Sequence, residues 1–302
     1  MPSLLRKIFC SPLFKTYRSE AVDSPGSISN KKSSIFTKIL RVIAIFIVLT
    51  ASLIIIFNSF DEGIYDDEYF SSDYQEDGCN VSGISIIGDI VTLSGEEETV
   101  YTSADDIIYN LQLVEDDKES KALFIEIDSV GGYPVAAEEI AMAIKRLNKP
   151  TVALIREYGD SAAYWVASAA DTIFASRSSE LGSIGVTSSY LDYTDQNQKD
   201  GIKFIELSSG KYKNIGDPDK PLTQEEKDLM MRDINILHQN FVEAVAENRN
   251  MDIEKVKQLA DGSAMLGQMA LDNGLIDKIG VYHDALDYLE ELLGEKPEIC
   301  WY

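Results

Sequence analysis

The chain has 302 residues, of which 45% are hydrophobic, 26% are charged and 9% are aromatic. This ordinary globular composition excludes a wholly disordered, a collagen-like and a disulfide-dense protein. A net charge of −24 at pH 7 makes the surface repel phosphate backbones, so nucleic acid is not expected as a partner. With 3 Cys and 2 His, and no closely spaced set among them, we expect neither a metal site nor a cofactor.

The first part of the chain predicts a membrane anchor. Residues 1–41 are rich in lysine and arginine, and the uncharged apolar segment within 42–60 approaches the ~20 residues that cross a bilayer. Because a positive flank stays inside, we interpret 1–41 as cytoplasmic and 42–60 as a single-pass signal anchor in the cell (inner) membrane. A cleaved signal peptide is disfavoured by the long basic lead and the lack of a small-residue cleavage site. A buried core helix is disfavoured because the segment has no polar face.

The remainder is then expected outside the cytoplasm. Residues 61–82 form an acidic linker, 83–295 a folded domain and 296–302 a C-terminal tail. Cys79 and Cys300 would both lie in the extracytoplasmic part, where a disulfide between them is possible but is not established by the sequence.

Strand and helix patterns alternate through the first half of the domain. The predicted strands cover 83–95 (a strand or short hairpin), 121–129, 150–158 and short pieces of 172–186. The predicted helices are one N-capped by Ser103, an amphipathic one over 134–147 that begins at Pro134, and one rich in small residues over 160–171. Strands joined by helical crossovers predict parallel pairing and an α/β fold.

Two further helices are predicted in the second half. Thr223 and Glu226 make a capping box for a long helix through about Asn248. Its predicted apolar side consists of Leu229, Leu237, Phe241 and Val245. A shorter helix is predicted near 284–293.

Two strand-to-helix junctions carry the residues that suggest chemistry. The turn D-S-V-G-G (128–132) offers backbone N–H groups that could bind an anion or a developing oxyanion, although a plain tight turn needs the same residues. In G-D-S-A-A-Y-W (159–165), Ser161 can be read equally as a nucleophile or as a helix N-cap. Both readings stay open at this point.

A serine nucleophile needs a base. The two histidines, His238 and His283, are interpreted as surface residues away from any nucleophile-like turn, which disfavours a Ser–His–Asp triad. A lysine can replace histidine if burial lowers its pKa. The segment S-S-G-K-Y-K-N-I (208–215) offers Lys211 and Lys213.

Taken in order, these motifs resemble the signal peptide peptidase A (SppA) family of Ser–Lys dyad serine peptidases, which has a crotonase/ClpP-like core of repeated ββα units. The resemblance covers roughly residues 83–290 and rests on an ordered set of motifs. These are IEIDSVGG, KPTVALI, S-A-A-Y-W, AADTIFAS, LGSIGV, SGKYKNI with PLTQEEK, and LADGSAMLGQMALDNGLIDKIG.

The resemblance implies a nucleophile at Ser161 and a general base at Lys213 rather than Lys211. It also implies an oxyanion hole from Gly132 (or Gly131) and Ala162, and a lysine-orienting role for Ser183. This chain departs from the family pattern in three places: Val130 replaces a proline, Ala162 and Ala163 replace two glycines, and Asp160 precedes the nucleophile.

These departures have predictable effects. A buried carboxylate near the lysine would favour the ammonium form and oppose general-base action. An alanine in place of glycine would be strained wherever φ is positive.

In short, single-domain relatives, serine and lysine meet across a protomer boundary in a ring, so the resemblance implies a homo-oligomer that cleaves apolar peptides such as remnant signal peptides. Two other readings are kept. One is a catalytically weak or inactive scaffold in a membrane assembly. The other is a crotonase-type enzyme of acyl thioesters, which an extracytoplasmic location disfavours.

Overall fold

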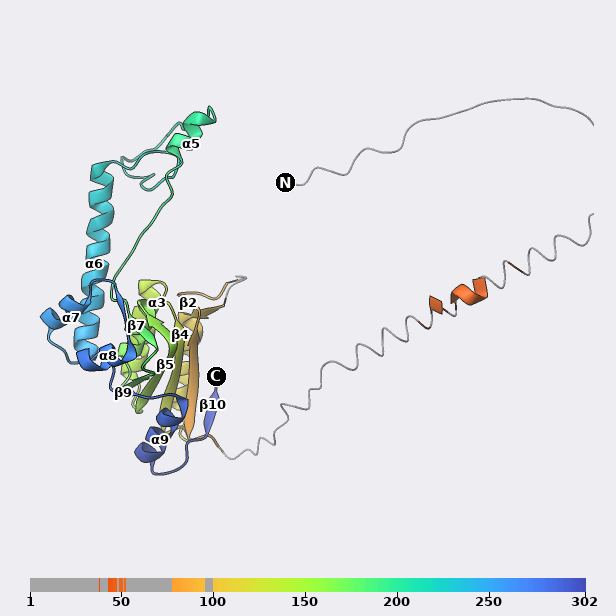
Figure 1. Ribbon diagram of the computed structural model, residues 1–302, viewed down its shortest axis with the longest axis vertical. Helices are drawn as coiled ribbons and strands as arrows, with labels where there is room; N and C mark the ends of the chain where they lie inside the picture. Colours follow the sequence, from red (N-terminus) through yellow and green to blue (C-terminus); the bar gives the residue numbers. More distant parts are fainter. Residues whose placement is uncertain (1–37, 39–42, 48, 51, 53–77, 96–99) are drawn as a thin grey trace, which may run out of the picture. The chain divides into compact units, whose positions relative to one another are not determined.

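A computed structural model describes residues 38, 43–47, 49–50, 52, 78–95 and 100–302 (Figure 1). The chain divides into two compact units, Met1–Gln75 and Glu76–Tyr302. The predicted cytoplasmic segment, the predicted anchor and most of the predicted linker lie outside the described residues, apart from a few helical positions between 38 and 52. Within the described residues, no helix is long and apolar enough to cross a membrane.

The second unit is built on a mainly parallel sheet with the order β10-β1-β4-β5-β6-β9 (Figure 1). Its strands are β1 (Val81–Ile87), β4 (Ala122–Ser129), β5 (Thr151–Asp160), β6 (Thr172–Ala175), β9 (Lys278–Ile279) and β10 (Ile299–Trp301). The end of β5 also pairs with β7 (Glu180–Gly182), which pairs antiparallel with β8 (Ala264–Leu266). A separate parallel pair is formed by β2 (Asp89–Val91) and β3 (Tyr101–Ser103). The predicted α/β class with parallel strands is confirmed.

Helices cover both faces of this sheet because its buried strands are apolar on both sides. Ile125 and Ile127 of β4 face the larger core, whereas Phe124 faces a second core under α9 (Tyr282–Leu293). The larger core is closed by α2 (Ala104–Asp116), α3 (Pro134–Arg146), α4 (Ala162–Ser168) and part of α6 (Gln224–Asn248). The remaining helices are α5 (Thr194–Lys199), α7 (Ile253–Leu259) and α8 (Gly267–Asn273).

The capping signals in the sequence fall where predicted. The Ser103 side chain accepts a hydrogen bond from the Asp106 N–H at the start of α2. Pro134 begins α3, and Thr223 and Glu226 form the reciprocal capping box of α6. These caps satisfy N–H groups that the first helical turn leaves without partners.

The long helix α6 packs on the domain through its C-terminal half only. Phe241 and Val245 are buried, and the Phe241 ring stacks on Trp165 of α4 with ring centroids 5.0 Å apart. Leu229 and Leu237, predicted on the same apolar side, are only partly buried. The reason is that the N-terminal half extends beyond the sheet, toward α5 and the loops around it (Figure 1). We call residues 186–223, which leave the sheet after β7 and return through α6, the arm.

The C-terminal residues are part of the sheet rather than a tail. Strand β10 pairs in parallel with β1, and Trp301 packs where a Cβ on Gly83 would lie 2.6 Å from its ring. Cys79 and Cys300 form a disulfide with their Cα atoms 5.7 Å apart. A three-residue strand is too short to show alternation, which is why the sequence did not indicate it.

The disulfide predicts a redox-dependent stability. It joins residues 221 positions apart, so reduction releases a large loop in the unfolded chain. We expect Cys300→Ser to lower the free energy of unfolding by about 2–5 kcal/mol, measured by urea unfolding of the full-length chain. Reductant should destabilise the wild type to the same level and leave Cys300→Ser unchanged. Equal stability of the oxidised wild type and the variant would contradict this.

Candidate active site

Ser161 has the backbone of a strained junction and not that of a helix cap. It stands between β5 and α4 with φ 53° and ψ −122°, and its side chain makes no capping hydrogen bond. Its N–H donates to the Gly182 carbonyl (2.9 Å) and its carbonyl accepts from the Trp165 N–H (3.0 Å). A non-glycine residue at positive φ costs of order 1–3 kcal/mol and is typical of functional sites. Ser161 thus occupies the N-cap position of α4, but its side chain does not cap the helix.

The two glycines after β4 are required by close backbone approaches. Gly131 has φ 115°, and a Cβ there would lie 2.9 Å from Ser161 Cβ and 3.1 Å from the Ala162 nitrogen. A Cβ on Gly132 would lie 2.1 Å from the Ile90 carbonyl oxygen. At Gly131 the turn after β4 therefore packs directly on the start of α4, and at Gly132 it packs on the backbone of Ile90 in β2, so a side chain at either glycine would disturb one of these two contacts.

Two backbone N–H groups near Ser161 are available to a ligand. Ala162 is the first residue of α4, so its N–H has no acceptor within the helix. Around Gly132, Ile90 uses its N–H on the Gly131 carbonyl and its carbonyl on the Tyr133 N–H, and no acceptor for the Gly132 N–H occurs in the described residues. The Gly131 N–H donates to Ser129 Oγ (3.1 Å). Of the two glycines considered, Gly132 is thus the one with a free donor.

Ser161 opens into a cleft of about 550 Å³. Ser183 lines the same cleft with φ 46°, and its hydroxyl donates to the Gly262 carbonyl (3.1 Å). Apolar lining comes from Val130, Pro134, Val186 and Ile234, and polar lining from Asn235, His238 and Asp261.

The structure corrects the interpretation of His238. This residue lies on α6, lines the Ser161 cleft, and its Nε2 is 3.0 Å from the Ala260 carbonyl oxygen. A carbonyl only accepts, so Nε2 carries the proton in this contact. The sequence could not indicate this because His238 and Ser161 are 77 positions apart and meet only through the packing of α6 on α4. His283 is exposed on α9, as predicted.

Lys213 lies away from this cleft within one copy of the chain. It is exposed, in the arm, next to Lys211, whose ammonium contacts Glu225 (2.5 Å) at the start of α6. At ~1.5 Å per residue, roughly 14 Å of helix separates Glu225 from Ile234, the first α6 residue in the cleft. A single copy therefore does not bring Lys213 to Ser161.

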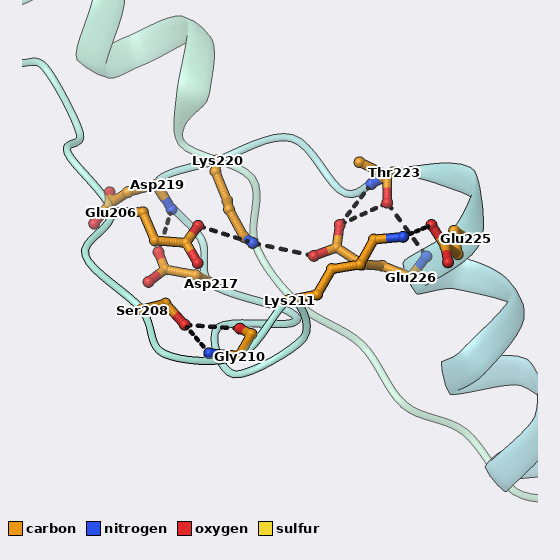
Figure 2. A network of polar contacts seen from close by, with 10 residues as sticks. All are labelled: Glu206, Ser208, Gly210, Lys211, Asp217, Asp219, Lys220, Thr223, Glu225 and Glu226. Carbon is orange, nitrogen blue, oxygen red and sulfur yellow. Dashed lines mark hydrogen bonds and ion pairs between the residues drawn. The ribbon is translucent and has the colours of Figure 1, made fainter.

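A polar network holds this part of the arm on the start of α6 (Figure 2). Lys220 bridges Glu206 (3.3 Å) and Glu226 (3.0 Å), and Ser208 closes a turn onto Gly210. Hydrogen bonds that Glu226 accepts from Thr223 and Lys220 lower the pKa of Glu226 to about 2. The network gives the loop around Lys213 a defined position at the N-terminal start of α6.

The network also distinguishes the two candidate lysines. The Glu225 carboxylate and the Tyr212 hydroxyl raise the pKa of Lys211, which favours its charged form. The Lys213 ammonium has no hydrogen-bond or ion-pair partner in the part of the chain that the structure describes. Lys213 is therefore the lysine that remains available to another surface.

Asp160 is buried next to Ser161 without a counter-ion. It is 8% exposed, and its Oδ1 has no hydrogen-bond partner among the described residues. Burial, and then the Glu180 carboxylate on β7, raise the pKa of Asp160 to about 6. A mostly ionised carboxylate thus lies beside the candidate nucleophile at neutral pH.

The other two departures from the family pattern cause no strain. Neither Ala162 nor Ala163 has a positive φ, because the unusual conformation falls on Ser161 itself. Both alanines are buried in α4. Val130 is 58% exposed at the mouth of the cleft, where a proline is not required for the turn.

Comparison with known proteins identifies the family. The model of peptidase family S49 matches residues 143–296, about half of the chain. The chain belongs to peptidase family S49. This confirms the resemblance to SppA-type serine peptidases at the level of the family.

Two S49-like relatives show how far the similarity extends. A candidate protease of Methanocaldococcus jannaschii is 36% identical over 203 residues, 65% of each chain. A candidate signal peptide peptidase SppA of Enterococcus faecium is 36% identical over 184 residues, 60% of this chain and 54% of that one. The match thus spans between about half and two thirds of these relatives.

Among solved structures, a ClpP1 mutant from Listeria monocytogenes is similar with 17% identity and a TM-score of 0.45, covering 68% of this chain and 94% of that chain. This likeness is too low to carry an argument. The crotonase/ClpP-like description of the core therefore stays a prediction.

The contact of Gly131 with Ser161 yields a test of the site's geometry. Gly131→Ala combines positive φ with a 2.9 Å contact, so we expect a loss of about 1–3 kcal/mol in the free energy of unfolding, by urea unfolding. Gly210→Ala is the matched control, because nothing lies within 4 Å of its Cβ position. Equal stability of the two variants would contradict the close approach.

The raised pKa of Asp160 predicts a pH-dependent stability. The folded state binds this proton more tightly than the unfolded state, so the wild type loses stability as pH rises from about 3.8 to about 6. Asp160→Asn removes the titration, and its advantage over the wild type should grow across that window to about 3 kcal/mol, measured by urea unfolding at several pH values.

Asp261→Asn should have the opposite pH dependence and lose stability relative to the wild type as the pH rises. The reason is that hydrogen bonds from Ser263 lower the pKa of Asp261. An Asp160→Asn variant that is less stable than the wild type at pH 7 would show that the buried carboxylate has a partner.

Proposed function

We propose that this protein is a serine endopeptidase that cleaves apolar peptides with Ser161 as nucleophile and Lys213 as general base. The observation that carries the proposal is the conformation of Ser161. Its strained backbone, its unbonded hydroxyl and its place in a cleft beside free N–H groups are what a nucleophile requires. Membership of peptidase family S49 supports the same reaction.

The base comes from a second copy of the chain. Lys213 is exposed in the arm, and among the described residues it has no ion-pair partner and no lysine lines the Ser161 cleft. Docking of the arm on a neighbouring copy would bury the Lys213 amine, and burial lowers a lysine pKa toward neutrality. The neutral amine then accepts the Ser161 hydroxyl proton. We therefore propose a homo-oligomeric ring.

The acyl transfer follows from the groups around Ser161. As Lys213 takes its proton, Ser161 Oγ attacks the peptide carbonyl carbon, and negative charge develops on the carbonyl oxygen. In this proposal the N–H groups of Ala162 and Gly132 stabilise that oxygen. Gly131, whose N–H donates to Ser129, lets the turn lie close to Ser161 because it has no side chain. The Lys213 ammonium returns the proton to the leaving amine, and water hydrolyses the acyl-enzyme by the same route.

Ser183 is proposed to orient the lysine. Its hydroxyl proton is used on the Gly262 carbonyl, so its oxygen lone pairs face no other donor among the described residues and can accept a hydrogen bond from Lys213 Nζ. Ser183 lines the same cleft as Ser161, which supports this role.

The substrates proposed are remnant signal peptides or other apolar segments. Val130 lines the cleft and is 58% exposed, and Tyr133 and Val135, the chain neighbours of the lining residue Pro134, are 65% and 54% exposed. An apolar peptide would remove this surface from water.

We propose that the catalytic domain is extracytoplasmic and held at the cell membrane by residues 42–60, with the N-terminus in the cytoplasm. The apolar run and its basic flank support the anchor. The Cys79–Cys300 disulfide supports an oxidising compartment for the domain.

The dyad is tested by three alanine variants of the full-length protein with a fluorogenic apolar peptide. We expect Ser161→Ala and Lys213→Ala each to lower kcat/KM by at least about 10³-fold, because the nucleophile or its base is lost. Lys211→Ala is the matched control from the same loop and should keep most of the activity.

Oligomer size is measured on the same samples. A wild type that assembles yet is as inactive as Ser161→Ala would favour the scaffold reading, for which the unpaired Asp160 is the observation. Equal loss in Lys211→Ala and Lys213→Ala would contradict the assignment of the base.

A further inference from the structure

Asp160 is the least favourable polar side chain of the domain's core. An ionised carboxylate without a partner is expensive to bury, and Asp160 has one oxygen out of contact with both water and any donor in the described residues. It is the last residue of β5, directly before Ser161, and does not itself line the Ser161 cleft. Neither the sheet nor α4 needs a charge at this position.

The charges around Asp160 do not neutralise it. Glu180 on β7 adds a second negative charge, and Asp128 at the end of β4 accepts the Tyr158 N–H (3.0 Å). Toward the cleft, the titratable groups are His238 and Asp261. His238 uses its Nε2 proton on the Ala260 carbonyl, and Asp261 is held in its charged form by Ser263.

We propose that Asp160 is a positioning residue: its buried charge holds the Lys213 side chain of a second copy at the Ser161 cleft as an ammonium ion and so sets the pH at which the dyad becomes active. The proposal rests on the proposed function, because it requires Lys213 to reach Ser161. It adds a residue that tunes the base and that does not itself touch the substrate.

Lys213 is suited to this role because, among the described residues, no carboxylate forms an ion pair with it. Lys211 is paired with Glu225 and Lys220 with Glu206 and Glu226. Lys213 has no such partner among the described residues, so the buried carboxylate beside Ser161 meets an unpaired ammonium. The two groups are complementary in charge.

The size of the effect follows from the distance along the chain. Neighbouring Cα atoms are about 3.8 Å apart, so with the reach of both side chains the Ser161 hydroxyl and the Asp160 carboxylate lie at most roughly 10 Å from each other. At an effective dielectric constant of about 20, a charge at that distance raises the pKa of an amine by about one to two units. The neutral amine that accepts the Ser161 proton then forms only at a correspondingly higher pH.

The test is the pH dependence of kcat/KM for the full-length protein with a fluorogenic apolar peptide, from about pH 6 to 10.5. We expect Asp160→Asn to move the ascending limb of the profile to lower pH by about one to two units, and to raise kcat/KM about tenfold or more at a pH on the ascending limb of the wild type. Asp160→Glu keeps the charge and should return the limb toward the wild-type value.

Asp272→Asn is the matched control, because it removes an exposed carboxylate on α8 and changes the net charge equally. Its limb should stay where the wild-type limb is. Thermal unfolding is recorded for each variant to confirm that it folds.

An unchanged limb in Asp160→Asn, with Ser161→Ala and Lys213→Ala both inactive, would overturn this inference and leave the dyad intact. Loss of activity at every pH in a folded Asp160→Asn protein would overturn it as well. Full activity in Ser161→Ala, or none in the wild type at any pH, would overturn the proposed function itself.

Discussion

The site depends on one close approach between two backbones. Strands β4 and β5 run in parallel, and the turn after β4 lies against the first residue of α4, so that Gly131 touches Ser161 where no Cβ fits. This contact puts the turn that carries Gly132 against Ala162, the first residue of α4, next to Ser161 at its positive φ. The apolar cores on both faces of the sheet fix the two strand ends, which is how they sustain a strained residue.

The same geometry separates Ser161 from the proposed base within one copy. The end of β7 pairs with the end of β5 and receives the Ser161 N–H, and from there the chain leaves the sheet as the arm. It returns through α6, whose C-terminal half packs on α4 and brings His238 to the cleft. The arm therefore holds Lys213 away from Ser161 of the same copy, as the proposed pairing between copies requires. At the junction between β5 and α4, the buried and unpaired Asp160 carboxylate adds a desolvation cost to the folded state.

Much of this could be predicted from the sequence because it is local. The caps at Ser103 and Thr223, the alternating strands and helices, and the paired glycines follow from backbone requirements that involve a few neighbouring residues. What the sequence did not show depends on packing between distant segments. Examples are His238 in the cleft, the β10 strand on β1, and the outer half of α6, whose apolar residues cover no core. The choice of Gly132 over Gly131 as donor needed the position of the Ser129 hydroxyl.

The central claim is that Ser161 and Lys213 of different copies form one active site. Mixing the Ser161→Ala and Lys213→Ala proteins, with subunit exchange, tests it most directly. If the two residues act across an interface, the inactive variants should recover activity together, on the order of a quarter of the wild-type rate at random mixing. Mixed oligomers that form and stay inactive would contradict the claim, because each copy would then need its own serine and lysine.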